Sequence, residues 1–414
     1  MARRVLLALV LLAVIFFPVS GLVPSDQPQQ AACRGCTAVQ PLVTQRWTAP
    51  LTGPWLAGGS AGSGVAGTVP AAGQAYVAVG GGIAVVGDGT TLTAFSLDHG
   101  RQLWQAVLPE PAGASIMSVR AWPGAVTVGI LRPGGLTRTE AVLSAATGAK
   151  LQEYPAAVFG GAVAASLTTT VVVGRKGVTS YDNQTGRKRW YRPTGRNRPW
   201  RADRQTLYVA ESADGYLGSS PVTALKVINL NTGTERTLGS PLGYPFSGTL
   251  AVADDGMVLF ASASGVTAYS GSTGDLLWSM AGAVAEGTDP AADLIYLTSA
   301  GTTLTGVDPL TGQVKTSVSG SVADGAASMY VVRDGVALGL DRGANGDAWG
   351  YDVAAGRVTW TSAQLPWPHY FSDVSGLGGS AATSGGSSVV VVAACPQATS
   401  AGVCADPELV AFRL

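Results

Sequence analysis

Ionisable side chains are scarce in this chain of 414 residues, and their charges cancel. Only 13% of the residues are charged, and 26 Lys and Arg are balanced by 26 Asp and Glu. Because the net charge is zero, the protein as a whole does not attract nucleic acid, and we expect no nucleic-acid partner. Hydrophobic residues make up 46% of the chain, which excludes disorder and is enough for a large core.

A sustained helical pattern is also missing. Beyond the first 23 residues, no segment keeps the 3.6-residue period of an amphipathic helix. The chain instead contains 56 Gly and 23 Pro, which interrupt it at short intervals. Short β-branched runs lie between these breaks, at residues 170–173, 258–261, 294–297 and 389–392. The sequence therefore predicts an all-β fold of short strands joined by turns.

Only the N-terminus carries a long apolar run. Arg3 and Arg4 precede apolar sequence that continues, with a Pro and a Ser, to Val23. A positive start followed by an apolar run is typical of a secretory signal peptide, and the run is also just long enough to span a bilayer. Residues 1–23 are therefore a signal peptide or a membrane anchor. Both alternatives predict that the rest of the chain is extracytoplasmic.

Cysteine is rare, with four residues. Cys33 and Cys36 form a C-x-x-C pair in an expected linker, residues 24–40, whereas Cys395 and Cys404 bracket a loop between two strand-like runs. Because an exported protein meets oxidising conditions, we predict two structural disulfides, for which three pairings are possible. A thioredoxin-like site would need the C-x-x-C to open a helix after a strand, and a zinc site would need a nearby histidine. Neither context is present in the sequence.

The remaining sequence, residues 41–414, repeats one short unit. A strand with Tyr or Phe leads into a polar turn that ends in Gly, and a second strand follows that often carries Trp. The clearest copies are residues 92–104, 178–190, 266–278 and 348–360. The turn glycines are Gly100, Gly148, Gly186, Gly233, Gly274, Gly312 and Gly356. Their mean spacing of about 43 residues is the length of a four-stranded propeller blade.

The two chain ends match the two halves of one further repeat. Residues 409–414 correspond to the strand before a turn, and residues 42–47 correspond to the strand after one. Pairing them would complete a blade and remove two free strand edges. We therefore predict an eight-bladed β-propeller of four-stranded antiparallel blades, with seven blades as the alternative. Pairing of the N- and C-terminal strands is expected to close it.

The repeat resembles that of pyrroloquinoline quinone (PQQ)-type propellers, through the pattern Ala-Tyr/Phe-x-x-x-Thr-Gly-x-x-x-Trp. The resemblance covers roughly residues 41–414. That family includes quinoprotein dehydrogenases, the propeller lipoprotein of outer-membrane protein assembly, and exported actinobacterial proteins of unknown role. The resemblance implies that the repeat tryptophans pack between neighbouring blades. These residues are Trp47, Trp104, Trp190, Trp278 and Trp360.

Catalytic motifs lack the context that their chemistry requires. In quinoprotein dehydrogenases, PQQ lies in the central channel beneath a disulfide of adjacent cysteines, beside a calcium held by Glu, Asn and Asp; adjacent cysteines are missing here. Residues 58–62 fit G-x-S-x-G and residues 62–67 fit G-x-G-x-x-G, but both lie in a Gly/Ser-rich stretch with no helix pattern after it. His369 has no identifiable catalytic partner. We therefore predict no catalytic residue, metal or cofactor; the alternative is a PQQ-dependent oxidoreductase or a carbohydrate-acting enzyme.

One segment stands out by its charge. Residues 186–204 contain eight basic residues and one acid, interleaved with Trp190, Tyr191 and Trp200. The basic residues are Arg187, Lys188, Arg189, Arg192, Arg196, Arg198, Arg201 and Arg204. Such a cluster suits phosphate- or carboxylate-bearing polymers, although it can also be an ordinary solvated strand edge. We predict a non-catalytic extracytoplasmic binding or assembly platform, whose partner is a protein or an anionic envelope polymer.

Overall fold

A computed structural model shows the fold of this protein. The residues it describes are 44–51, 55–56, 75–88, 90–108, 114–133, 138–156, 160–174, 176–194, 200–202, 205–212, 222–238, 249–252, 257–262, 265–289, 293–299, 303–319, 327–333, 336–341, 348–352, 357–361, 389–394, 403–404 and 408–413. All of them belong to one compact unit, Pro41–Leu414. Their regular elements are β-strands, so the predicted all-β class is confirmed. Within these ranges, no helix is long and apolar enough to cross a membrane.

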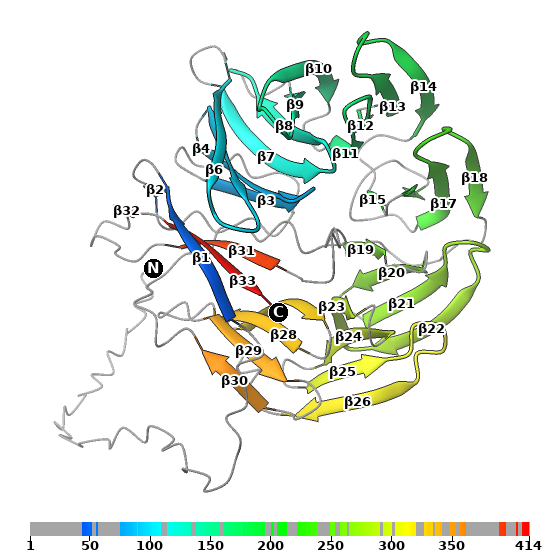
Figure 1. Ribbon diagram of the computed structural model, residues 1–414. Coiled ribbons are helices and arrows are strands. Elements are labelled where there is room, and N and C mark those ends of the chain that lie inside the picture. The colour runs from blue at the N-terminus through cyan, green and yellow to red at the C-terminus, as the bar shows by residue number, and fades with distance from the viewer. Residues whose placement is uncertain are drawn as a thin grey trace, which may run out of the picture. The chain divides into compact units, whose positions relative to one another are not determined.

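The strands form antiparallel sheets of four consecutive strands, and seven such sheets lie in the described part of the chain (Figure 1). The first sheet contains β3 (Ala75–Gly80), β4 (Ile83–Asp88), β5 (Thr91–Ser96) and β6 (Gln102–Val107). The second contains β7 (Ser115–Trp122), β8 (Ala125–Leu131), β9 (Arg138–Ser144) and β10 (Lys150–Ala156). The third contains β11 (Gly161–Ala165), β12 (Thr169–Val173), β13 (Gly177–Asp182) and β14 (Lys188–Pro193).

The next four sheets repeat this order. The fourth contains β15 (Trp200–Ala202), β16 (Thr206–Ser212), β17 (Val222–Asn229) and β18 (Glu235–Leu238). The fifth contains β19 (Thr249–Val252), β20 (Met257–Ser262), β21 (Gly265–Ser270) and β22 (Leu276–Ala281). The sixth contains β23 (Ala283–Asp289), β24 (Leu294–Ser299), β25 (Thr303–Val307) and β26 (Val314–Ser319). The seventh contains β27 (Ala327–Arg333), β28 (Val336–Asp341), β29 (Ala348–Asp352) and β30 (Arg357–Thr361).

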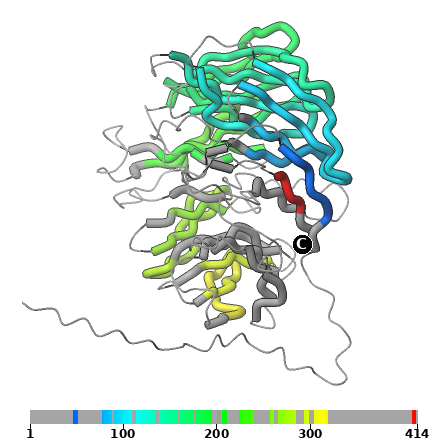
Figure 2. Tube along the Cα trace, turned by 90° about the vertical axis from the view of Figure 1, so that its left-hand side faces the viewer, coloured from blue at the N-terminus to red at the C-terminus, as the bar shows by residue number. Residues whose placement is uncertain are grey.

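The two chain ends share one sheet, the terminal sheet. Strand β33 (Glu408–Arg413) lies between β1 (Thr44–Pro50) and β31 (Val389–Ala394), and Figure 2 shows the first and last described segments side by side. The pairing predicted from the sequence is therefore present, while the count of eight blades and the closure of the ring stay predictions. Cys404 lies not in a loop but in β32 (Val403–Cys404), which pairs with β2 (Trp55–Leu56).

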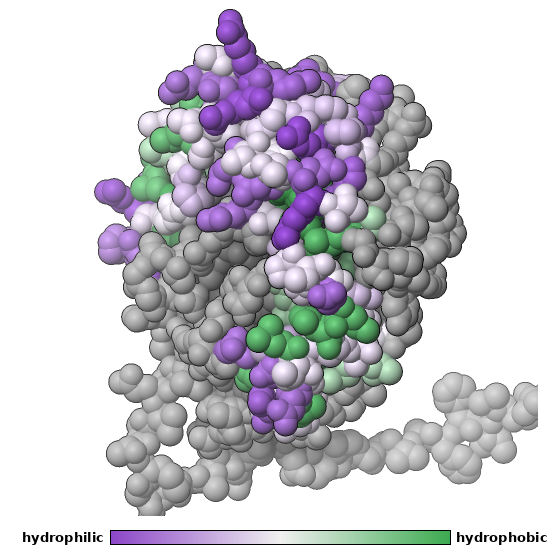
Figure 3. Space-filling model, turned by 90° about the vertical axis from the view of Figure 1, so that its right-hand side faces the viewer, coloured by the Kyte–Doolittle hydropathy of each residue, from purple (hydrophilic) through white to green (hydrophobic). Residues whose placement is uncertain are grey.

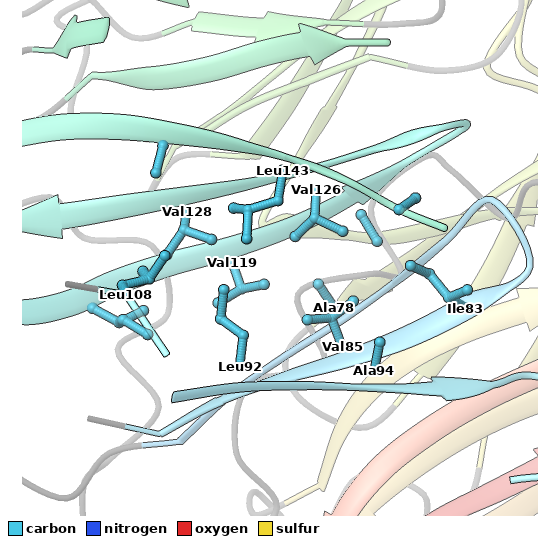
Figure 4. Close-up of a cluster of buried hydrophobic side chains, with 14 of the residues drawn as sticks. Ala78, Ile83, Val85, Leu92, Ala94, Leu108, Val119, Val126, Val128 and Leu143 are labelled. Atoms are coloured by element: carbon cyan, nitrogen blue, oxygen red, sulfur yellow. The ribbon is translucent and has the colours of Figure 1, made fainter. Parts of the chain in front are cut away.

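Apolar side chains fill the space between consecutive sheets. All seven residues of β8 are buried, because this middle strand is covered on both faces. Between the first and second sheets, Val85 and Leu92 face Val119 and Val126 (Figure 4). Comparable clusters join the terminal sheet to the first and each sheet to the next as far as the sixth. Each large side chain that is fully buried in this way contributes about 1.5–3 kcal/mol.

The repeat turns share one hydrogen-bond pattern. In the third sheet, the amide of Gly186 donates to the carbonyl of Asp182, and the amide of Asp182 donates to the carbonyl of Arg187. The carboxylate of Asp182 also accepts hydrogen bonds from the amides of Gln184 and Thr185 and from the hydroxyl of Thr185. Gly186 has a φ of +70°, a conformation that favours glycine. The same main-chain pattern recurs at Gly100, Gly148, Gly233, Gly274 and Gly312.

Repeat tryptophans lie against the turn of the following sheet. The indole N–H of Trp278 donates to the carbonyl of Pro309 at 2.6 Å. A Cβ atom at Gly312 would lie 2.6 Å from Cγ of Trp278, so the ring and the turn touch only because position 312 is glycine. The equivalent contacts are Trp47 with Gly100 and Trp104 with Gly148. This contact sets the separation of neighbouring sheets at the turn end.

Gly312→Ala is expected to destabilise the protein more than Gly282→Ala. Both glycines have a φ of +67°, so the two substitutions share a backbone cost on the order of 1 kcal/mol. Among the described residues, no atom lies within 4 Å of a Cβ at Gly282, whereas at Gly312 the methyl group would overlap Trp278. That overlap adds roughly 1–3 kcal/mol. Denaturant unfolding measures both losses, and equal losses would show that the contact does not matter.

The turn carboxylates predict a dependence of stability on pH. Hydrogen bonds from Thr185 and Thr311 hold the pKa values of Asp182 and Asp308 below their usual 3.8. A lowered folded-state pKa stabilises the fold above the unfolded pKa, and this contribution is lost as the pH falls through the folded value. Asn229 accepts the same three bonds and cannot be protonated.

Replacing both aspartates, Asp182→Asn with Asp308→Asn, tests this dependence. The wild-type protein is expected to melt at the higher temperature at neutral pH, and the gap to the double variant is expected to close below about pH 4. Thermal melts across this range measure the gap. A gap that stays constant down to about pH 2 would contradict the assignment.

Candidate functional site

The basic segment predicted from the sequence runs along the outer edge of the third sheet and into the fourth. Its exposed described members are Arg187, Lys188 and Arg189, on or next to β14. Arg192 on β14 is half-buried, and Arg201 lies in β15, where the structure describes the backbone. Arg196, Arg198 and Arg204 lie outside the described residues. The side of the protein that carries β14 and β18 is hydrophilic over its upper part (Figure 3).

Three exposed cations on this edge, Arg187, Lys188 and Arg189, are called the basic edge below. The ammonium of Lys188 lies 5.3 Å from the ring centroid of Tyr191, and the guanidinium of Arg189 donates to the hydroxyl of Thr169. A β-bulge at Arg189 inserts this residue between two paired positions of β14, and bulges re-aim side chains. Within the described part of the chain, no carboxylate lies within ion-pair distance of the three cations.

The neighbouring outer strand β10 is different, because its charges are paired. The carboxylate of Glu153 accepts hydrogen bonds from Lys150 and Arg132, each at 2.5 Å. Burial alone would raise the pKa of Glu153, but these hydrogen bonds outweigh burial and lower it to about 2. Both cations near β10 are thus ion-paired with a carboxylate. The cations of the basic edge differ, because among the described residues no carboxylate lies within ion-pair distance of them.

Trp190 and Arg192 belong to the joint between the third and fourth sheets. A Cβ atom at Gly233 would lie 2.6 Å from Cδ2 of Trp190, so the ring packs on this turn as other repeat tryptophans do. The guanidinium of Arg192 donates to the carbonyls of Gly233 and Tyr191. Nε1 of Trp190, in contrast, is buried and has no hydrogen-bond partner among the described residues. Arg192 therefore differs from the basic edge, because main-chain acceptors occupy it.

Tyr154 holds the joint between the second and third sheets, a role that the sequence did not indicate. Its ring stacks on Tyr181 with centroids 4.1 Å apart, and its hydroxyl donates to the side chain of Asn183 at 2.9 Å. Burial raises the pKa of Tyr154 to about 12, with smaller contributions from Asp182 and Tyr181, so the hydroxyl stays protonated. Gln152 occupies the position of the repeat tryptophan. The signal for this joint in the sequence was Tyr154 itself, an aromatic residue two positions after Gln152.

Charged side chains lie deep between the second and third sheets. Arg138 and Glu140 are neighbours on β9, with side chains 8% and 2% exposed, and their Nη2 and Oε1 atoms are 2.7 Å apart. Arg138 also donates to the hydroxyl of Ser118. Gly129 lies opposite Glu140 on β8, and a Cβ there would be 2.2 Å from Nη2 of Arg138. The glycine makes room for the guanidinium, and the buried charges are paired.

Arg120 links the first strands of three consecutive sheets. It extends from β7, donates to the carbonyl of Ala162 on β11, and lies with its guanidinium carbon 5.3 Å from the ring centroid of Trp200 on β15. Sequence reasoning missed these buried charges because single arginines in strands form no motif. Among the described residues, no group of three His, Cys, Asp or Glu is placed to hold a metal ion.

Several predicted residues cannot be placed. Trp360 and Cys404 lie in strands of which the structure describes the backbone. The other positions fall outside the described residues: 58–67, Cys33, Cys36, Gly356, His369 and Cys395. The predicted disulfides and the expected absence of a cofactor stay predictions.

Glu140→Leu is expected to destabilise the protein by roughly 3–5 kcal/mol, because it removes the carboxylate that pairs with a buried guanidinium. The double variant Arg138→Met with Glu140→Leu is expected to regain most of this loss, since neither charge is then buried. Denaturant unfolding of both variants is the measurement. A double variant no more stable than the single one would show that packing dominates at this place.

Comparison with known proteins gives a family and a fold. The family profile described as outer membrane protein assembly factor BamB matches residues 45–191 and 200–400. A search of curated proteins gave no match. Among solved structures, quinohemoprotein alcohol dehydrogenase from Comamonas testosteroni aligns with 90% of this chain and 76% of its own, at 13% identity and a TM-score of 0.54. The corresponding enzyme of Pseudomonas putida HK5 aligns over the same shares, at 14% identity and a TM-score of 0.53.

BamB from Moraxella catarrhalis is 21% identical over 64% of this chain and 79% of its own, with a TM-score of 0.44. At identities of 13% and 14%, the dehydrogenases show the shared fold alone, which is the β-propeller. The predicted relationship to PQQ-like repeat proteins is confirmed. Since the profile matches well over half of its length, the chain belongs to the family described as outer membrane protein assembly factor BamB.

Proposed function

We propose that this protein is a non-catalytic, extracytoplasmic binding platform whose basic edge docks on an anionic polymer of the cell envelope. The observation that carries the proposal is the basic edge itself. Three exposed cations of like sign stand together on or next to the outer strand β14, with no carboxylate in ion-pair distance among the described residues. The family's description as an assembly factor supports a role in binding other molecules.

The chemistry of the edge favours a flexible polyanion. Arginine guanidinium groups and a lysine ammonium bind phosphate and carboxylate oxygens through charge-assisted hydrogen bonds. Since all three cations are exposed, they reach a ligand without a change in the core. Exposed charges are screened by salt, so a complex of this kind weakens as ionic strength rises. An acidic protein surface is the alternative partner, and it presents carboxylates in place of phosphates.

The repeat supplies a matched control for this edge. Arg187 and Arg189 are the first and third residues after the turn glycine of the third sheet. Arg101 is the first residue after Gly100, and Lys315 is the third residue after Gly312; both are exposed. The double variants Arg187→Gln/Arg189→Gln and Arg101→Gln/Lys315→Gln therefore remove the same charge from the same repeat positions on different sheets.

The wild-type protein is expected to bind long-chain inorganic polyphosphate at low salt and to release it at high salt. Arg187→Gln/Arg189→Gln is expected to bind roughly tenfold more weakly, because two charge-assisted contacts are lost. Arg101→Gln/Lys315→Gln is expected to bind like the wild type. Titrations with fluorescently labelled polyphosphate at several salt concentrations give the affinities, with poly-glutamate as the second probe.

Two results would overturn the proposal. Wild-type protein that binds neither polyanion at low salt has no such site. An equal loss in the two double variants would show that net charge, and not the basic edge, governs binding. Salt-sensitive binding of poly-glutamate without polyphosphate would favour an acidic protein partner over an envelope polymer.

A further inference from the structure

The indole N–H of Trp190 differs from that of the other repeat tryptophans with described side chains. Each of the other three donates to the carbonyl three residues before the turn glycine of the next sheet. These bonds are Trp47 to Leu97, Trp104 to Ala145 and Trp278 to Pro309. Trp190 packs on Gly233 in the same way, yet its Nε1 is buried with no partner among the described residues.

Arg192 occupies this joint together with Trp190. It lies two residues further along β14, and its guanidinium donates to the carbonyl of Gly233, the glycine on which the indole packs. A buried donor without an acceptor opposes folding, since it has lost its hydrogen bonds to water. An indole N–H can only donate, so this donor needs an acceptor that the described residues do not supply.

We propose that Trp190 and Arg192 form a phosphate-binding pair that acts when the polymer docks on the basic edge. In the complex, the guanidinium of Arg192 leaves the carbonyl of Gly233 and binds one phosphate oxygen. Nε1 of Trp190 then donates to a second oxygen of the same phosphate. This inference rests on the proposed function. It specifies a phosphate group as the ligand that binds at the joint between the third and fourth sheets.

A phosphate of a polymer suits this pair, because it offers two non-bridging oxygens, one for the guanidinium and one for the indole. The basic edge lies on or next to the same strand and binds the flanking charges, which brings the phosphate to the joint. No proton or covalent bond is exchanged, because both residues donate existing N–H groups.

Phenylalanine variants separate ligand binding from folding. Trp190→Phe keeps an aromatic ring on Gly233 and removes an N–H that has no partner among the described residues, so its midpoint of unfolding is expected to fall only by the cost of the smaller ring. Trp278→Phe removes a formed hydrogen bond and is expected to lower the midpoint. The two variants are expected to differ in the opposite sense in their affinity for polyphosphate. Trp190→Phe is expected to bind it roughly tenfold more weakly than the wild type, and Trp278→Phe is expected to bind it as tightly as the wild type.

Tryptophan fluorescence supplies a readout that a merely structural role would not change. The difference between the emission spectra of the wild type and Trp190→Phe isolates the signal of residue 190. This difference spectrum is expected to change on addition of polyphosphate, since the indole gains a hydrogen bond. An unchanged difference spectrum with polyphosphate bound would overturn the proposal.

The remaining outcomes distinguish this pair from the basic edge. If Trp190→Phe binds polyphosphate like the wild type while Arg187→Gln/Arg189→Gln does not, the pair is wrong and the proposed function stands. If wild-type protein does not bind polyphosphate, both fall. A fall in the unfolding midpoint of Trp190→Phe as large as that of Trp278→Phe would make the role of Trp190 structural. Binding to phosphatidylglycerol vesicles without binding to polyphosphate would overturn the polymer as the source of the phosphate.

Discussion

The packing of consecutive sheets against one another is the constraint on which this structure depends. A four-stranded sheet whose middle strand is apolar on both faces, as β8 is, cannot be stable alone, because each face must be covered by a neighbour. The Trp–Gly contact sets the distance between neighbouring sheets at the turn end. Apolar clusters fill the rest of the interface toward the inner strands. On an outer strand such as β22, only Trp278 is buried, and the exposed positions beside it can vary in charge without loss of the core.

The joints show how far the contact between sheets can vary. Trp278 combines ring packing with a hydrogen bond to the next turn. Tyr154 instead stacks its ring on Tyr181 and donates its hydrogen bond to Asn183. On either side of the fourth sheet, arginines supply the bonds to the turn: Arg192 to Gly233, and Arg236 to Gly271 and Ser272. Basic residues on outer strands thus have two roles, and hydrogen bonds to the next turn distinguish the arginines that hold a joint from the cations of the basic edge.

The repeat predicted most of the fold because its signals are local. A polar turn ending in Gly between two short strands is legible within about a dozen residues, and the terminal strands were recognised as two halves of that unit. The joints were not legible, because their partners are far apart in sequence: Tyr154 meets Asn183, and Arg120 reaches Ala162 and Trp200. Which side chain fills each place depends on strand register and on a β-bulge, and neither leaves a motif in the sequence.

Charged side chains on outer strands prevent sheets of different molecules from pairing. Protection of this kind is a simpler explanation of the basic edge than a binding partner. Charges of either sign, or both together, serve that purpose. Strand β10 shows this, because its Lys150 is paired with Glu153 on the same strand. Three cations of one sign, with no carboxylate within ion-pair distance among the described residues, exceed what protection requires. Like charges repel, so such an excess on one strand is better explained by a partner of opposite charge.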